Sequence, residues 1–336
     1  MGLFISLIAI VVLILIPWAG AGVPGLQFIF GIALPYIALA VFIIGIIARI
    51  LKWASSPVPF RITTTAGQEK SLPWIRQNKL DNPSTMLGVL GRMALEVFFF
   101  RSLFRNTKAS LKDGKTLVYG DEKWLWLFSI AFHYSFLIIF LRHFRFFTNP
   151  VPSFVPLLQG IDGFFQVGLP IVYVTNVIVF AALLFLFFRR LVNQKVKYIS
   201  LASDYFPLLL IVGIAATGIL MRYFLKPDLI TVKDIAYGIL SFNPPDAATL
   251  TKADPIFYIH FFLVSILLIY FPMSKLVHMS GIFMSPTRNL ANNNRMKHHE
   301  NPWNSEFKMH HHTYQEYEDE FREVMKGVGL PLDKED

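Results

Sequence analysis

Long runs of apolar residues alternate with short polar segments along this chain of 336 residues. Six such runs stand out, and most reach the roughly 20 residues that an α-helix needs to cross a hydrocarbon core of about 30 Å. They cover residues 3–19, 27–51, 124–147, 168–188, 204–224 and 256–279. The pattern predicts an all-α, polytopic transmembrane bundle of about six helices.

The first run is short, and the AGAG that follows it resembles the cleavage site of a signal peptide. The chain lacks a basic segment ahead of this run, however, and a second apolar run follows after only a few residues. We therefore interpret residues 3–19 as a retained helix that forms a hairpin with the second run, with a turn around Pro24 and Gly25.

The polar segments divide the chain into four parts. A Pro-, Thr- and charge-rich stretch separates the hairpin from the third run, and a polar tail follows the sixth. The predicted parts are an N-terminal transmembrane hairpin (1–53), a cytoplasmic loop with an interfacial helix (54–123), a four-helix core (124–280) and a cytoplasmic tail (281–336). Segments 148–167 and 225–255 are predicted outer loops, and a short helix is one interpretation of part of the first.

Two helices are predicted outside the spans. Ser84 is a candidate N-cap for a helix that runs to about Arg105. Its four charged residues make spanning unlikely, which favours a position in the cytoplasmic interface or packed against the bundle. In the tail, Thr313 precedes YQEYEDEFREVMK, which has acids in its first turns and predicts a short surface helix. We expect the tail to dock a soluble partner.

The distribution of charge gives the orientation. The chain is 54% hydrophobic and carries a formal charge of +9. Residues 49–123 hold 13 Lys or Arg against 6 acids, whereas segment 148–167 has no basic residue. This positive-inside pattern predicts a multi-pass protein of the cytoplasmic membrane with both termini in the cytoplasm. The basic residues thus mark topology, and we expect no binding of nucleic acid.

Cysteine is absent from the chain. The chain therefore cannot itself hold a cysteine-ligated iron–sulfur cluster, attach a c-type haem through thioether bonds or catalyse a reaction with a thiol. Any redox function must use cofactors that are bound without covalent bonds, and it must pass electrons to another subunit.

Four histidines within the spans are the main candidates for function. His133 and His143 lie in the third run, and His260 and His278 lie in the sixth. An ionisable side chain inside a membrane is costly and suggests a functional site. Two histidines on each of two helices suit bis-imidazole ligation of two haem irons at different depths.

The predicted topology pairs these histidines. The third and sixth runs are antiparallel, so His133 and His278 lie toward the cytoplasm, and His143 and His260 lie toward the outside. On a regular helix, side chains 18 residues apart, such as His260 and His278, point to the same face. Side chains 10 residues apart, such as His133 and His143, differ in direction by about 80°. At 1.5 Å per residue the separations also differ, roughly 27 Å against 15 Å. Helix tilt and off-axis haem positions would have to absorb this difference.

Other interpretations of the histidines remain open. They could be interfacial or hydrogen-bonded core residues without a cofactor. Zinc or copper would need ligands that converge at one place, whereas these lie at two depths. The other five histidines lie in the polar tail, where a solvated segment is favoured over a metal site. They are His298, His299, His310, His311 and His312.

A family resemblance supports the haem interpretation. Over about 120–290 the histidine spacing resembles the haem b membrane subunit of respiratory nitrate reductase, the gamma subunit family. Further segments resemble one branch of that family, the DsrM cytochrome b subunits of the membrane complex linked to dissimilatory sulfite reduction. Those segments are RSLFRNT, TLVYG, LRHFRFFTNPVP, YISLASDYFPL, TGILMRYF, SPTRNLANN and YEDEFR. The family has a five-helix core, so the role of residues 1–123 stays open.

The resemblance implies two haems b, held by His133, His143, His260 and His278, and electron exchange with menaquinone. It also implies a partner resembling the iron–sulfur subunit of heterodisulfide reductase, and further subunits with c-type haems and iron–sulfur clusters. Two alternatives are a haem-free membrane anchor for redox partners and a diheme ferric or ascorbate-linked reductase.

Following the family, we place the quinone near the outer haem, close to His143. Haem propionates and quinone oxygens favour cationic donors, and Arg142, Arg145 and Arg222 are the candidates. Their other interpretation is ordinary snorkelling to the interface. Asp162 could relay protons, although a turn residue is favoured. At the inner rim, Arg189 and Asp204 could anchor propionates, or they could serve only as topology signal and helix cap.

Overall fold

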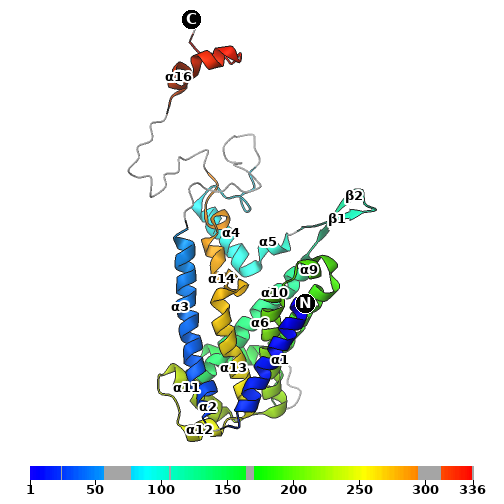
Figure 1. Ribbon diagram of the computed structural model, residues 1–336, viewed down its shortest axis with the longest axis vertical. Coiled ribbons are helices and arrows are strands. Elements are labelled where there is room, and N and C mark those ends of the chain that lie inside the picture. Colours follow the sequence, from blue (N-terminus) through cyan, green and yellow to red (C-terminus); the bar gives the residue numbers. More distant parts are fainter. Residues whose placement is uncertain (24, 57–76, 106, 164–169, 294–311, 335–336) are drawn as a thin grey trace.

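The structure is a computed structural model, and it describes residues 1–336 except 24, 57–76, 106, 164–169, 294–311 and 335–336. Within the described residues, six helices are long and apolar enough to cross a membrane (Figure 1). The predicted all-α polytopic bundle is therefore confirmed. The first span is α1 (Gly2–Gly20), and the second consists of α2 (Leu26–Phe28), η1 (Ile29–Ala33) and α3 (Leu34–Ala54). The others are α6 (Lys123–Phe147), α8 (Val174–Val192), α10 (Ala202–Leu220) with η2 (Met221–Leu225), and α13 (Pro255–Tyr270) with η3 (Phe271–Met273).

The six helices pack in a defined order. α6 packs against α8, α8 against α10, and α10 against α13. The N-terminal pair covers the other side of α13: α1 lies against α10 and α13, and α3 runs along α13. Leu210 and Leu263 are fully buried between these helices. The first two spans are therefore part of the packed bundle.

The sixth span does not continue as a regular helix to residue 279, contrary to the sequence interpretation. α13 (Pro255–Tyr270) passes into the 3₁₀ turn η3 (Phe271–Met273), which contains Pro272. Ser274 is extended, and the chain resumes as η4 (Lys275–Val277) and α14 (His278–Gly281). Proline removes a backbone donor and clashes with the preceding turn, so it ends the regular helix. His260 and His278 thus lie on separate elements.

The fourth span is also shorter at its start than predicted. α8 begins at Val174, and residues 170–173 are irregular, whereas the sequence interpretation began the helix at 168. The predicted turn residue Pro24 lies outside the described residues. Gly25 has a φ of 87°, a left-handed value that glycine adopts without strain, so it can close the first hairpin.

One end of the bundle, called here the α1 end because α1 begins there, carries most of the extra elements (Figure 1). α4 (Met86–Phe99) is capped by Thr85 and not by Ser84, since the Thr85 hydroxyl accepts a hydrogen bond from the Gly88 N–H. The helix ends at Phe100, which is left-handed, and α5 (Arg101–Phe104) follows. The predicted single helix to Arg105 is therefore two helices.

A β-hairpin at the α1 end was not predicted. β1 (Thr107–Lys112) pairs with β2 (Thr116–Asp121) in antiparallel register. Asp113, Gly114 and Lys115 connect the strands, and the first two have positive φ. An Asp-Gly pair is a known hairpin signal, so the sequence did contain the information for this turn.

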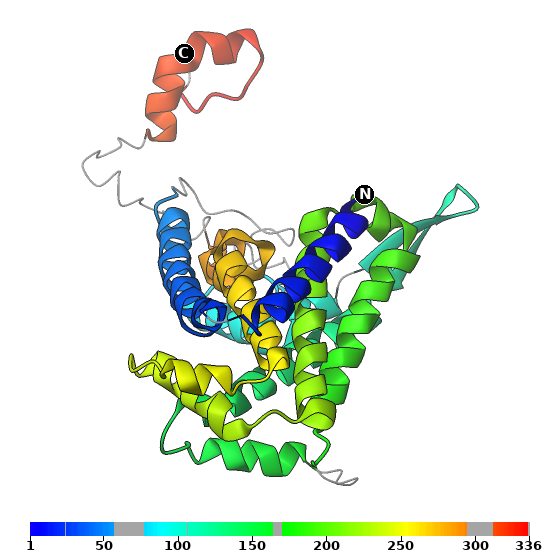
Figure 2. The same cartoon turned by 60° about the horizontal axis from the view of Figure 1, so that its bottom comes forward.

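The opposite end, called the α7 end, carries α7 (Phe154–Asp162), α11 (Leu229–Leu240) and α12 (Ala247–Thr251). Figure 2 brings this end forward. The short helix expected within 148–167 is confirmed as α7. Segment 225–255, expected to be a loop, contains α11 and α12, whose N-caps Asp228 and Asp246 accept hydrogen bonds from backbone N–H groups.

The remaining helices lie in the linkers and the tail. They are α9 (Gln194–Ile199), η5 (Ile282–Met284), α15 (Pro286–Asn289) and α16 (Tyr314–Gly327). The Thr313 cap of α16 is confirmed, and Glu316 completes a capping box with it. Figure 1 shows α16 beyond the α1 end, away from the six spans.

The polarity of α4 is the reverse of that of a soluble surface helix. Its buried side chains include Arg92 and Glu96, while Leu87, Leu90 and Phe98 are exposed. An apolar outer face is favourable where it meets lipid. The interfacial position of this helix stays a prediction, and the pattern of exposure supports it.

Arg92 joins α4 to the segment that follows the last span. Its side chain is 1% exposed and donates to the carbonyl oxygens of Asp81, Arg288 and Leu290. Next to it, Asp81 accepts from Arg101 and Arg105. Burial alone would raise the pKa of Asp81, but these hydrogen bonds outweigh it and lower that pKa to about 2. Asp81 is therefore ionised at neutral pH.

We predict that Arg92→Ala destabilises the α1 end by roughly 2–4 kcal/mol, because it leaves three carbonyl oxygens without their donor. Two quantities measure the effect: the thermal midpoint of the purified protein, and the rate at which a protease cleaves the chain at α4 and at α15. Arg105→Gln is the matched control, since Arg105 is half exposed and shares Asp81 with Arg101. An Arg92→Ala protein as stable as the control would contradict the assignment.

Candidate functional site

The structure brings His133 of α6 and His278 of α14 together. Their ring centroids are 6.0 Å apart and their planes are almost perpendicular, at 86°. The Nδ1 atom of His133 lies 2.7 Å from the Ser129 carbonyl oxygen, and that of His278 lies 2.9 Å from the Lys275 carbonyl oxygen. Because a carbonyl oxygen only accepts, each Nδ1 carries the proton, and each Nε2 has a free lone pair.

This separation fits an iron between the two rings. Two metal–imidazole bonds of about 2 Å each, plus the distance from each nitrogen to its ring centre, place the centroids about 6 Å apart. His278 is exposed and His133 is half-buried, so neither ring is enclosed by other side chains. The donor set, two neutral imidazoles with available Nε2 atoms, matches the axial ligands of a six-coordinate haem.

A second pair lies nearer the α7 end of α6, around His143. The His143 Nδ1 atom is 2.7 Å from the Ile139 carbonyl oxygen. The His260 Nδ1 atom is 2.9 Å from the Thr217 hydroxyl oxygen, and that hydroxyl donates to the Gly213 carbonyl oxygen at 2.8 Å. The hydroxyl therefore accepts from His260. His143 is within electrostatic range of His260.

The His260 ring packs against α10 beside Gly218. A Cβ added at Gly218 would lie 3.4 Å from the Cε1 atom of His260. The ring thus lies directly against α10, next to Thr217. The sequence interpretation left Gly213 and Gly218 as either packing residues or space for a haem. In the structure, the Gly213 carbonyl orders Thr217, and Gly218 admits the imidazole.

The segment between the hairpin and the core contacts His133 of the first histidine pair. The Phe100 ring packs edge-on against His133, with ring centroids 4.9 Å apart. α4 is held there by α6, because the Trp126 Nε1–H and the Tyr134 hydroxyl donate to carbonyl oxygens of Phe99 and Phe98. The left-handed conformation of Phe100 thus ends α4 at the point where its ring meets His133.

A buried ion pair lies beside the second histidine pair, at the α7 end. Arg142 Nη1 is 2.8 Å from the Asp162 carboxylate, and the two residues are 7% and 6% exposed. Asp162 also accepts from the Thr175 N–H and hydroxyl, and Arg142 donates to Asn176. The interpretation of Asp162 as a turn residue was wrong: it connects α7 to α6 and α8.

A tyrosine ring lies between two arginines in the same region. The guanidinium carbons of Arg142 and Arg222 are 3.8 Å and 4.0 Å from the Tyr173 ring centroid. Arg222 also donates to the Ile171 carbonyl oxygen. Simple snorkelling into water therefore does not describe either arginine.

Arg145 differs from its two neighbours. It is half-buried, lies 5.6 Å from the Phe146 ring centroid, and makes no ion pair or hydrogen bond with any residue that the structure describes. Of the three arginines proposed from sequence, it alone has a guanidinium available to an incoming anionic or carbonyl group, within the described part of the chain.

The inner-rim candidates have structural partners. Asp204 accepts from the Leu201 N–H at 3.0 Å and from Lys275 Nζ at 2.7 Å. Arg189 donates to Glu122 at 3.3 Å. The helix-cap interpretation of Asp204 is thus confirmed. Of the tail histidines, His298, His299, His310 and His311 lie outside the described residues. Among described residues, no group of three or more His, Asp or Glu could hold a metal ion.

The fold and the site define a multi-pass membrane protein in which two histidines of α6, His133 and His143, lie near His278 of α14 and His260 of α13. The sequence comparisons agree with this class. Residues 85–295 match the nitrate reductase gamma subunit family, and the chain belongs to that family.

Two relatives extend the likeness. A protein of Archaeoglobus fulgidus, named Hdr-like menaquinol oxidoreductase cytochrome b-like subunit, is 48% identical over 279 residues, which is 82% of this chain and 83% of the relative. A protein of the same name from Archaeoglobus profundus is 45% identical over 275 residues, 81% of each chain.

We predict that Asp162→Asn destabilises the protein by roughly 3–5 kcal/mol, because it leaves the buried Arg142 charge without its partner. The double variant Arg142→Met with Asp162→Leu should recover much of this loss, since it removes both charges together. Thermal midpoints measure both effects. Asp234→Asn, an exposed position on α11, is the control. Equal midpoints for all variants would contradict the ion pair.

Proposed function

We propose that this chain is a diheme cytochrome b subunit that exchanges electrons between menaquinol and an iron–sulfur partner. One observation carries the proposal. All four histidines within or next to the spans have Nδ1 engaged by a hydrogen-bond acceptor, which leaves four Nε2 atoms as potential ligands. Hydrogen bonds of this kind fix the tautomer and orientation of metal-binding histidines.

The residues fit one haem at each pair. His133 and His278 would hold the haem at the α1 end, and His143 and His260 would hold the haem toward the α7 end. A haem with two imidazole ligands carries single electrons and has no free position for oxygen. The chain supplies neutral imidazoles, an apolar surrounding and fixed ring planes, which together determine where each haem sits and how far it is from water.

We place the quinol site beside His143, at the α7 end, where the family resemblance puts it. Arg145 is the best candidate for contact with the quinone, because its guanidinium has no partner within the described residues. Arg142 and Arg222 act indirectly in this proposal. Their ion pair and their stacking on Tyr173 hold α6 and η2 (Met221–Leu225) in position.

We further propose the sulfite-reduction-linked branch as the finer assignment, with a partner resembling the iron–sulfur subunit of heterodisulfide reductase. The names of the two relatives support the Hdr-like partner, since both are called Hdr-like menaquinol oxidoreductase cytochrome b-like subunits. The link to sulfite reduction rests on the sequence resemblance alone. A chain without cysteine needs such a partner for any iron–sulfur chemistry. Following the positive-inside pattern, the α1 end with α16 faces the cytoplasm and meets this partner. Subunits with c-type haems would complete the complex.

We predict that the purified complex contains two b-type haems for each copy of this chain, and that His133→Ala and His278→Ala each lose the same single haem. His143→Ala and His260→Ala should each lose the other. Redox difference spectra with total haem per chain measure the loss. His312→Ala, in the tail, is the control and should keep both haems. A folded wild-type chain without haem would contradict the cytochrome proposal and favour the haem-free membrane anchor.

We predict that Arg145→Gln lowers kcat/KM for a soluble menaquinol analogue about tenfold, the cost of losing one charge-assisted hydrogen bond. Haem content should not change, because Arg145 does not contact either histidine pair. Lys226→Gln, a basic position at the same end, is the matched control. An unchanged kcat/KM would remove Arg145 from the quinol site, and inhibition by a quinol analogue would then show whether any such site exists.

A further inference from the structure

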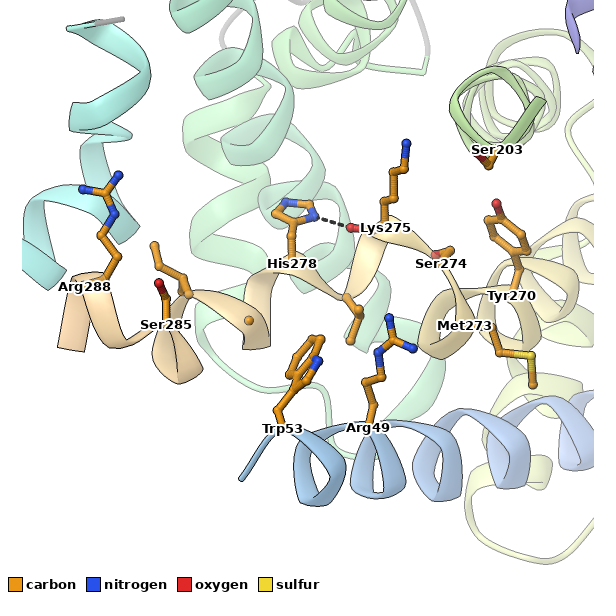
Figure 3. Close-up of a pocket in the computed structure, with 13 residues that line it drawn as sticks. Arg49, Trp53, Ser203, Tyr270, Met273, Ser274, Lys275, His278, Ser285 and Arg288 are labelled. Carbon is orange, nitrogen blue, oxygen red and sulfur yellow. Dashed lines mark hydrogen bonds between the residues drawn. The ribbon is translucent and has the colours of Figure 1, made fainter. Parts of the chain in front are cut away.

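A groove at the α1 end lies between the C-terminal turns of α3 and the segment that follows α13 (Figure 3). Arg49 and Trp53 of α3 form one wall, Ser203 of α10 lies opposite, and residues 270–288 form the floor. Its volume is about 710 Å³. A space of this size admits a ligand much larger than water or a simple ion.

The lining of this groove is cationic. Arg49, Lys275 and Arg288 line it, and none of the lining residues is acidic. Lys275 is paired with Asp204, and Arg288 lies 3.4 Å from Glu96. Arg49 stacks over Trp53, with 5.3 Å between its guanidinium carbon and the ring, and it has no ion pair or hydrogen bond with a described residue. The Nε–H of Arg49 is buried and has no hydrogen-bond acceptor among the described residues.

A smaller apolar hollow continues from the groove toward the middle of the bundle. Its volume is about 260 Å³, and it shares Arg49 and Met273 with the groove. Gly45, Ala48 and Pro272 line it, and Lys52 stands at its rim. A cationic site that opens into an apolar hollow at the end of membrane helices matches an amphiphile with an anionic head and hydrocarbon chains.

His278 also lines the groove, so the groove adjoins the space between His133 and His278. Figure 3 shows the His278 ring on one side of the chain segment and the side chains of Arg49 and Trp53 on the other. Trp53 lies against that segment, since a Cβ added at Gly281 would be 3.5 Å from its ring. α3 packs along α13 and its continuation, whereas α6, which carries His133, packs against α8.

We propose that this groove binds an anionic membrane phospholipid, with its phosphate on Arg49 and its acyl chains in the hollow between α3 and Pro272. The argument uses the groove, its charge and its apolar extension, and it does not depend on the proposed redox function. Arg49 and Lys52 are three residues apart and so lie on one side of α3, where both can reach one phosphate group.

The test is lipid binding to the detergent-purified protein, measured by native mass spectrometry. Phosphatidylglycerol and phosphatidylcholine with identical acyl chains are titrated separately. Wild type should bind phosphatidylglycerol roughly fivefold more tightly or better, and Arg49→Gln should lose that preference. Arg49→Lys should retain most of it. Lys112→Gln, an exposed basic position on β1 outside the groove, should behave as wild type.

Several outcomes would overturn the proposal. Equal binding of the two lipids by wild type would show that the groove does not select an anion. An unchanged preference in Arg49→Gln, with a thermal midpoint equal to that of wild type, would place any lipid site elsewhere. Displacement of phosphatidylglycerol by an equal concentration of inorganic phosphate would show that the phosphate alone is bound. Loss of the preference in Lys112→Gln as well would show only a general effect of net charge.

Discussion

The hydrogen bond at the Nδ1 atom of each histidine is the constraint on which the site depends. Inside a membrane no water can satisfy a ring nitrogen, so the protein must supply the acceptor. His133 and His143 use the carbonyl four residues earlier on their own helix, Ser129 and Ile139. The bond orients each ring along α6 without help from another element. α6 can therefore orient two histidine rings from a single regular helix.

The partner histidines obtain their acceptors differently, and this difference shapes the rest of the fold. His260 needs the Thr217 hydroxyl of α10, which explains the close contact of α10 and α13. His278 uses the carbonyl of Lys275, three residues earlier, which is available because η4 is a 3₁₀ turn. The break at Pro272 creates that turn. A regular helix through residue 278 would instead offer a carbonyl four residues earlier.

The same break explains what could be predicted from sequence. The six spans could be predicted from the hydrophobic runs and the charge distribution, and the candidate histidine pairs from the positions of the four histidines. Both predictions need only residue type and spacing. The histidines are 10 residues apart in the third run and 18 apart in the sixth, and these spacings do not match if each run is one straight helix. The sixth run is not straight, and Pro272 in the sequence indicated the break. The Arg142–Asp162 pair could not be predicted, because it joins α6 to α7 through tertiary packing. No local pattern identifies which arginine a loop acid will meet.

The role of the N-terminal hairpin follows from the broken helix. Residues 1–84 lie outside the segment that matches the gamma subunit family, yet α1 and α3 both pack on α13. A Cβ at Gly45 would come within 2.6 Å of the Pro272 ring, so α3 meets α13 at its break and only glycine permits that approach. A segment interrupted by 3₁₀ turns has weaker internal hydrogen bonding than a regular helix. The hairpin therefore supports the segment from outside, while α6 and His133 face it from within the core.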